Sequence, residues 1–260
     1  MPFADVNGQR LFFEDSGGDG PAVLLSHGFL MDSTMFDPQV EALAPEFRCI
    51  RWDERAFGRT EFDGKPFTYW DSAADAIGLL DHLGIESAVL GGMSQGGFLS
   101  MRAALAHPDR VRALVLIDTQ SGGEDAAVLD GYRAMTADWL ANGPVNVGPI
   151  VANLIIGDPA HEPSWQAKWE TLPRENMTPA GDCLFDRDDI TDRLGEITCP
   201  ALVIHGTADQ AIPMEKAELL CERLPDCRGF VKVEGAAHAA NLTHPEVVNP
   251  PLLDFLRSVR

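Results

Sequence analysis

The chain has 260 residues, 45% of them hydrophobic, which suffices for one α/β domain with an inserted segment. Its formal net charge of -20 argues against binding to nucleic acid or to an anionic membrane surface. No apolar run approaches the roughly 18 residues of a membrane-spanning helix, and the first residues show no secretory signal, so we expect a cytoplasmic protein that contacts no membrane.

The first part of the chain alternates strand-like runs with helical patterns. Asn7-Gly8 separates two such runs, and this dipeptide is the strongest short signal of a β-hairpin. An amphipathic stripe predicts a helix over residues 68–83, with Thr68 or Asp71 as its N-cap. The remaining predicted elements are strands at 3–6, 9–15, 22–26 and 48–52 and a helix at 37–43.

A glycine-rich turn joins the apolar run at residues 87–90 to a helical pattern that begins at Gly97. The turn reads Gly92-Met93-Ser94-Gln95-Gly96 and fits the pattern G-x-S-x-G, which exposes a serine on a strained strand-to-helix turn. Small residues are required two positions before and after the serine, because the arms of the turn nearly touch. We therefore predict Ser94 as a nucleophile.

The strand at 22–26 ends in His27-Gly28-Phe29. A glycine at the carboxyl end of a strand lets the next backbone N–H turn toward the nucleophile. We therefore expect the N–H groups of Phe29 and Gln95 to form an oxyanion hole, with His27 in a structural role.

A further strand is predicted at 111–117, and after it residues 120–194 interrupt the alternation of strands and helices. Prolines separate short helical patterns, and we expect a helical cap over the active edge of the sheet, between core segments 1–119 and 195–260. Packing among the helices of the cap is the competing interpretation for each of its aromatic residues. The predicted pocket residues are Trp139, Trp165, Leu184 and Met93.

The last segment resumes the alternation with strands at 201–205 and 229–233. A loop with Asp209 follows the first of these strands, and a loop with His238 follows the second. A helix is expected to start at Pro213. The final helical pattern, at 245–260, must break or restart at Pro250-Pro251.

Alternating strands and helices predict a mostly parallel, doubly wound sheet whose ligands bind at the carboxyl ends of the strands. Ser94, Asp209 and His238 occur in the chain order that the serine motif demands. His238 would take the serine proton, and Asp209 would orient the imidazole. Asp118 also ends a strand and is the rival acid.

The five cysteines are an odd number with no metal-binding spacing. We expect reduced thiols, no bridge between Cys221 and Cys227, no metal and no cofactor.

These motifs together resemble the α/β-hydrolase superfamily, over residues 3–118 and 194–260. Two departures stand out: Ala56 replaces a glycine in the loop after residue 52, and Pro250-Pro251 is unusual in the final helix. The motifs that carry the resemblance are His27-Gly28, Gly92-Met93-Ser94-Gln95-Gly96-Gly97, His205-Gly206-x-x-Asp209 and Gly235-x-x-His238.

The resemblance is to the serine branch, around 3-oxoadipate enol-lactonase and bacterial carboxylesterases. It implies a cofactor-independent hydrolase of a small-molecule ester or lactone, monomeric or a small homo-oligomer. Ser94 argues against haloalkane dehalogenases and epoxide hydrolases, whose nucleophile is aspartate. The alternatives are a carbon–carbon bond hydrolase of ring-cleavage products, a cofactor-free perhydrolase or haloperoxidase, and a non-catalytic ligand-binding member of the fold.

Overall fold

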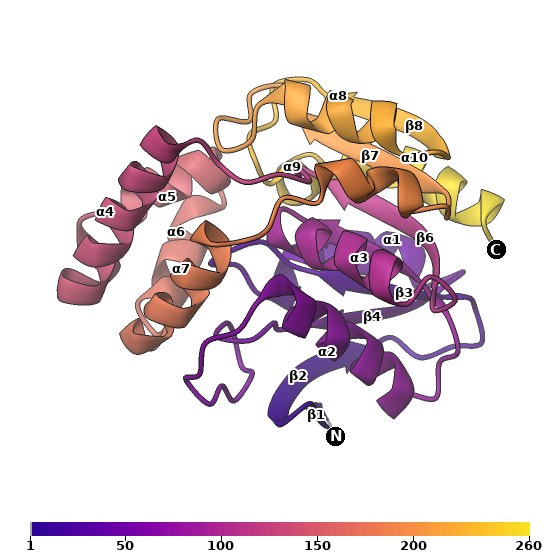
Figure 1. Ribbon diagram of the computed structural model, residues 1–260, viewed down its shortest axis with the longest axis horizontal. Helices are drawn as coiled ribbons and strands as arrows, with labels where there is room; N and C mark the ends of the chain where they lie inside the picture. The colour runs from indigo at the N-terminus through magenta and orange to yellow at the C-terminus, as the bar shows by residue number, and fades with distance from the viewer. Residues whose placement is uncertain (1) are drawn as a thin grey trace.

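The computed structural model describes residues 2–260, and within them eight strands form one sheet in the order β1-β2-β4-β3-β5-β6-β7-β8 (Figure 1). β2 pairs antiparallel with β1 and β4, and the other neighbouring strands pair in parallel. The predicted fold class is confirmed. The strands are β1 Phe3–Val6, β2 Gln9–Asp15, β3 Ala22–Ser26, β4 Arg48–Trp52, β5 Ala88–Met93, β6 Val111–Ile117, β7 Ala201–Gly206 and β8 Cys227–Val233.

Helices cover both faces of this sheet, as expected for parallel strands whose residues are apolar throughout. α2 and α3 pack side by side in front of the sheet in Figure 1, whereas α1 lies behind it and packs against α10. The helices are α1 Asp37–Leu43, α2 Tyr69–His82, α3 Gln95–Ala106, α4 Ala126–Asn142, α5 Gly148–Ile155, α6 Glu162–Trp169, α7 Met177–Phe185, α8 Met214–Arg223, α9 Ala240–Thr243 and α10 Pro245–Ser258, with short 3₁₀ turns at Ser33–Phe36, Gly143–Val145, Arg174–Asn176 and Thr191–Glu196.

The local signals of the first part of the chain act as predicted. Asn7 and Gly8 both have positive φ, at 48° and 77°, which is the conformation of a tight hairpin turn between β1 and β2. Thr68 caps α2 in a capping box with Asp71. Ala56 adopts a φ of 71°, so the loop after β4 keeps a glycine-like conformation despite the alanine.

α4, α5, α6 and α7, which we call the cap helices, lie together at the left of Figure 1, between β6 and β7 in the chain. The indole N–H of Trp169 donates to the carbonyl of Leu30 at 2.6 Å, and the amide of Asn176 donates to the carbonyl of Ala56. These bonds attach the cap helices to two loops at the carboxyl edge of the sheet. Within residues 2–260, no helix is both long and apolar enough to cross a membrane.

The prediction that Pro250-Pro251 interrupts the final helix is wrong, because α10 runs through both prolines. Tertiary packing overrides the local penalty of about 3 kcal/mol for an interior proline. The helix buries Val248 and Leu252 on either side of the prolines, and Gln39 donates a hydrogen bond to the side chain of Asn249.

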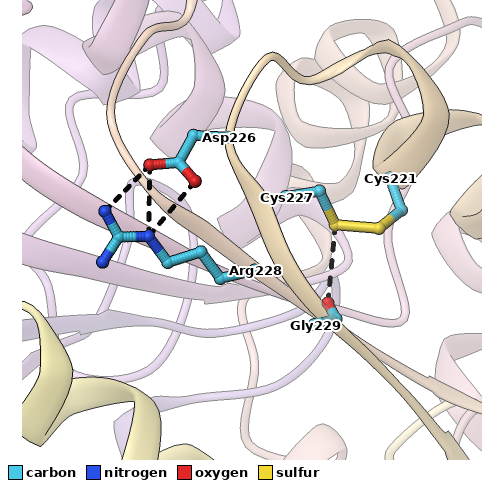
Figure 2. The surroundings of a disulfide bond; sticks show 5 residues. All are labelled: Cys221, Asp226, Cys227, Arg228 and Gly229. Atoms are coloured by element: carbon cyan, nitrogen blue, oxygen red, sulfur yellow. Dashed lines mark hydrogen bonds and ion pairs between the residues drawn. A yellow bond between two sulfur atoms is a disulfide. The ribbon is translucent and has the colours of Figure 1, made fainter.

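The expectation that Cys221 and Cys227 stay reduced is also wrong, because they form a disulfide between α8 and the first residue of β8 (Figure 2). The tight connection after α8 brings their Cα atoms to 5.2 Å, within the range a disulfide spans. Asp226 and Arg228 form an ion pair on either side of Cys227. The remaining cysteines, Cys49, Cys183 and Cys199, are free thiols.

Candidate active site

Ser94 occupies the sharp turn between β5 and α3, with a φ of 52° and a ψ of -116°. A Cβ on Gly92 would lie 2.1 Å from the backbone of Gly96, and a Cβ on Gly96 would lie 2.0 Å from the carbonyl oxygen of Ser26. Both glycines are therefore required by close backbone approach, as the motif predicts. The turn holds Ser94 in a strained conformation that an ordinary loop residue rarely adopts.

Two backbone N–H groups near Ser94 are available to donate hydrogen bonds to a substrate. Among residues 2–260, neither the N–H of Phe29 nor that of Gln95 donates a hydrogen bond. Gln95 is the first residue of α3, where backbone N–H groups lack partners within the helix. A Cβ on Gly28 would lie 2.4 Å from the sulfur of Met93, so a larger residue here would have to displace the Met93 side chain beside Ser94.

The side chain of Gln95 is held by two buried groups that the sequence analysis did not select. Its amide donates to Glu54 Oε2 at 3.0 Å, and the hydroxyl of Tyr69 donates to Gln95 Oε1 at 3.2 Å. Burial and the charges of nearby Asp75 and Asp53 raise the pKa of Glu54 well above its ordinary value. These contacts fix the start of α3, directly after Ser94.

His238 and Asp209 are joined at 2.7 Å, Nδ1 to Oδ2, although 29 positions separate them in the chain. The N–H groups of Ala211 and Ile212 donate to the other oxygen of Asp209. Burial opposes charging of the imidazole, but the charge and hydrogen bond of Asp209 outweigh it, so the pKa of His238 is raised. Burial likewise opposes charging of Asp209, but His238 and the Ile212 N–H hold the pKa of Asp209 below its ordinary value.

Ser94 and His238 line the same cavity, so the structure brings the three predicted residues to one place. Within residues 2–260, no direct hydrogen bond joins the side chains of Ser94 and His238. Catalytic hydrogen bonds are often longer before substrate binds, so the arrangement remains compatible with proton transfer between them.

Asp118, the rival acid, makes no hydrogen bond to His238 among the described residues and lies near the pair of His238 and Asp209. It is fully buried and accepts from the N–H of Gly206 at 2.7 Å and from that of Ala240 at 3.1 Å, one in each of the two segments that flank the pair. Burial and the charge of Asp209 raise the pKa of Asp118 well above its ordinary value. Asp118 therefore joins the backbone of the segments that carry Asp209 and His238.

Asp118, Asp209 and His205 bring possible metal-ligand atoms within 4.8 Å of one another. These groups already have other partners: His205 Nε2 lies 2.9 Å from the carbonyl of Ile212, and both carboxylates accept backbone hydrogen bonds. The cluster is therefore explained as internal support for the His238 loop.

The cavity over Ser94 lies between the core and the cap helices. Three of the residues proposed for the substrate pocket, Met93, Trp139 and Leu184, line it. Trp165 does not: it belongs to a separate hollow beside Leu30, where the ammonium of Lys168 lies 3.9 Å from the center of its ring. The structure thus places Trp165 outside the cavity that contains Ser94.

Sequence reasoning missed much of the cavity wall. The cap contributes Tyr132, Met135, Thr136, Leu154, Ile155, Met177 and Phe185, and the loop between β6 and α4 contributes Glu124. Helical spacing alone would not have separated these residues from those that face solvent. The apolar character of the wall suits a substrate with hydrocarbon or aromatic groups.

Comparison with known proteins places the chain among hydrolases of one fold. A family model described as the alpha/beta hydrolase fold matches residues 21–245. The non-heme chloroperoxidase of Streptomyces lividans is 31% identical over 97% of this chain and 98% of that protein.

Two solved structures are also similar over nearly their whole length. A thermophilic esterase from Thermogutta terrifontis is 30% identical, with a TM-score of 0.89 over 100% of this chain and 97% of that chain. The enol-lactonase from Burkholderia xenovorans LB400 is 26% identical, with a TM-score of 0.91 over 98% of this chain and 100% of that chain. Since these similar proteins carry out different reactions, the reaction of this chain has to be argued from its own site.

Proposed function

The chain belongs to the α/β-hydrolase family, and we propose that it is a serine hydrolase that cleaves a carboxylic ester or lactone through an acyl-enzyme intermediate. One observation carries this proposal: Ser94, on its strained turn, shares a cavity with the hydrogen-bonded pair of His238 and Asp209. A serine hydroxyl is a weak nucleophile until a base removes its proton, and this arrangement supplies the base.

In the first half of the reaction, Ser94 Oγ attacks the carbonyl carbon of the ester while His238 Nε2 takes its proton. The Nδ1–H of His238 donates to Asp209, which fixes the tautomer and stabilises the imidazolium. The free N–H groups of Phe29 and Gln95 would donate hydrogen bonds to the carbonyl oxygen as negative charge develops on it. The bond from carbon to the leaving oxygen then breaks, and His238 returns the proton to that oxygen.

In the second half, water attacks the acyl carbon of the Ser94 ester. His238 takes a proton from this water, and the same N–H pair stabilises the oxyanion. When the intermediate collapses, the bond from the acyl carbon to Ser94 Oγ breaks and His238 returns the proton to Oγ, which releases the carboxylic acid and restores the Ser94 hydroxyl.

The test is release of p-nitrophenol from short and medium acyl esters by the wild type and by Ser94→Ala. We expect the Ser94→Ala variant to lose activity by at least about 1000-fold. Ser72→Ala is the matched control, since Ser72 is a fully buried serine of α2 outside the cavity, and it should retain activity. Equal activity of the wild type and Ser94→Ala would exclude the proposal.

A second candidate is a cofactor-free perhydrolase or haloperoxidase, which the similarity to the chloroperoxidase favours. It would use the same acyl-enzyme, with hydrogen peroxide in place of water as the attacking molecule. Peracid formation from acetate and peroxide, faster than ester hydrolysis by the same preparation, would favour this activity. A carbon–carbon bond hydrolase is distinguished by cleavage of a ring-cleavage diketone. Tight ligand binding without turnover, unchanged in Ser94→Ala, would instead indicate a binding protein.

A further inference from the structure

The walls of the Ser94 cavity carry one carboxylate and no lysine or arginine among the described residues. Besides His238, the titratable side chains that line it are Glu124 and Tyr132. Burial raises the pKa of Tyr132 to about 12, so this phenol stays neutral at physiological pH. The one carboxylate on the wall is therefore that of Glu124.

A cation does lie behind this wall, but each of its three nitrogens already donates a hydrogen bond to the protein. Arg187 Nη2 donates to Glu124 Oε1 at 2.7 Å, Nη1 donates to the carbonyl of Leu184 at 2.7 Å, and Nε donates to the carbonyl of Gly122 at 3.1 Å. The guanidinium also stacks over Phe98, at 4.6 Å from the ring center. The Arg187 side chain is 1% exposed and does not line the cavity.

A substrate carboxylate in this cavity would thus have no free cation to pair with. Reaching Arg187 would require it to displace Glu124. Elsewhere on the cap side of the wall it would meet mostly apolar side chains, with the hydroxyls of Tyr132 and Thr136 as neutral donors. Either position removes water from an ionised group without supplying a cation in its place, which is unfavourable. The remaining polar contacts of Glu124 do not change this, since Gln120 donates to the same carboxylate.

We propose that the cavity accepts uncharged substrate groups and that Glu124 is the specificity-determining residue that excludes groups bearing a carboxylate. This inference rests on the proposed ester hydrolysis and adds the class of substrate. A lactone with a free carboxylate, such as that of 3-oxoadipate, is then a poor match for this chain. Neutral esters and neutral lactones are the matched class.

The test compares two esters of equal acyl length, p-nitrophenyl hexanoate and the mono-p-nitrophenyl ester of adipic acid. The wild type should prefer the neutral ester by on the order of 100-fold in kcat/KM. Measurement at about 0.5 M salt screens the long-range repulsion that the net charge of -20 exerts on any anion. A wild-type ratio near one would overturn the proposal.

Glu124→Gln removes the wall charge and leaves Arg187 without its anionic partner. We expect the preference for the neutral ester to fall by at least about tenfold in this variant. Asp130→Asn is the matched control, because it removes the same charge from an exposed position of α4 outside the cavity. Its ratio should equal that of the wild type, and an equal shift in both variants would contradict a local role for Glu124.

A binding measurement separates this inference from the proposed function. Ser94→Ala, titrated with both esters and followed by tryptophan fluorescence, reports affinity without cleavage, since Trp139 lies in the wall. Affinity at least about tenfold tighter for the neutral ester supports the charge selection even if the wild type cleaves neither ester, which would count against the hydrolase proposal alone. Equal affinities would overturn the charge selection whatever the activity.

Discussion

The two sides of the Ser94 cavity are built in different ways. On the core side, the turn that carries Ser94 is held by backbone contacts so close that Gly92 and Gly96 have no room for a side chain. On the cap side, the wall consists of side chains from several short helices, and α4 buries only Trp139 among its described residues. In the proposed reaction, the core side would therefore set the geometry of bond cleavage, whereas the cap side would set which substrate fits.

The largest expected effect tests the core side. Asp209→Asn removes the charge that orients and stabilises His238 while it keeps the size of the side chain. We expect kcat to fall on the order of 10,000-fold, as when the acid of a serine triad becomes an amide. Steady-state kinetics with a neutral ester check this. A loss of less than tenfold would mean that Asp118 or another group supplies the acid.

Two glycine substitutions compare the rigidity of the sides. Gly96→Ala places a Cβ 2.0 Å from the carbonyl of Ser26, and we expect the free energy of unfolding to fall by about 3 kcal/mol. Gly131→Ala in α4 meets no atom within 4 Å and should raise the free energy of unfolding by about 0.5–1 kcal/mol. Urea denaturation measures both. Similar destabilisation by the two changes would remove the contrast between core and cap.

The disulfide offers a perturbation of the core away from the cavity. Cys221–Cys227 lies at the amino end of β8, whereas His238 follows its carboxyl end. Because the bridge closes a short loop with a sequence separation of 6, Cys221→Ser should lower the free energy of unfolding by about 2 kcal/mol. Ester hydrolysis by the folded variant should be unchanged. Loss of activity in a variant whose stability is native would mean that the disulfide affects the active site as well as the stability.

A smaller effect is expected at the cap wall. Met135 lines the cavity from α4, and Met135→Ala enlarges it without touching Ser94 or His238. The preferred acyl chain should lengthen, with a change of about tenfold in kcat/KM between short and long esters. The chain-length profile of p-nitrophenyl esters gives the answer. A uniform fall in kcat for all chain lengths would show that the wall also affects bond cleavage.

The smallest expected effect is a shift in the pH profile. His238 must be neutral to act as the base, and the pKa of His238 is raised above its ordinary 6.5 by Asp209. Activity should therefore rise with pH, with its midpoint in kcat/KM above 6.5. Asp209→Asn removes the charge that raises the pKa of His238, whereas the burial that lowers this pKa remains. The midpoint of the residual activity should therefore move to lower pH. An unchanged midpoint would contradict the assignment of His238.

Much of the core side could be predicted from the sequence because it depends on local backbone rules. The strand-turn-helix around Ser94 and the hairpin at Asn7-Gly8 follow from which residues tolerate positive φ and close approach. The loops of Asp209 and His238 follow from strands that end at one edge of a parallel sheet. The membership in the α/β-hydrolase superfamily, inferred from these motifs, is confirmed.

Other features required the tertiary structure, because they join residues that are distant in the chain or reverse a local preference. Glu124 and Arg187 pair across 63 positions, and only the packing of the cap makes one a cavity wall and the other a buried support. The contact between Trp165 and Lys168 is local to α6, but only the docking of α6 against the core places Trp165 in the hollow beside Leu30 and outside the Ser94 cavity.

The sequence by itself thus determined the fold, the strained serine turn and the order of the proposed triad, since these arise from short-range sterics and strand periodicity. Tertiary structure alone decided that α10 continues through Pro250-Pro251, that Cys221 meets Cys227, and which cap side chains face the cavity. The physical reason is that burial free energy and chain closure act between segments, and they outweigh local propensities of a few kcal/mol.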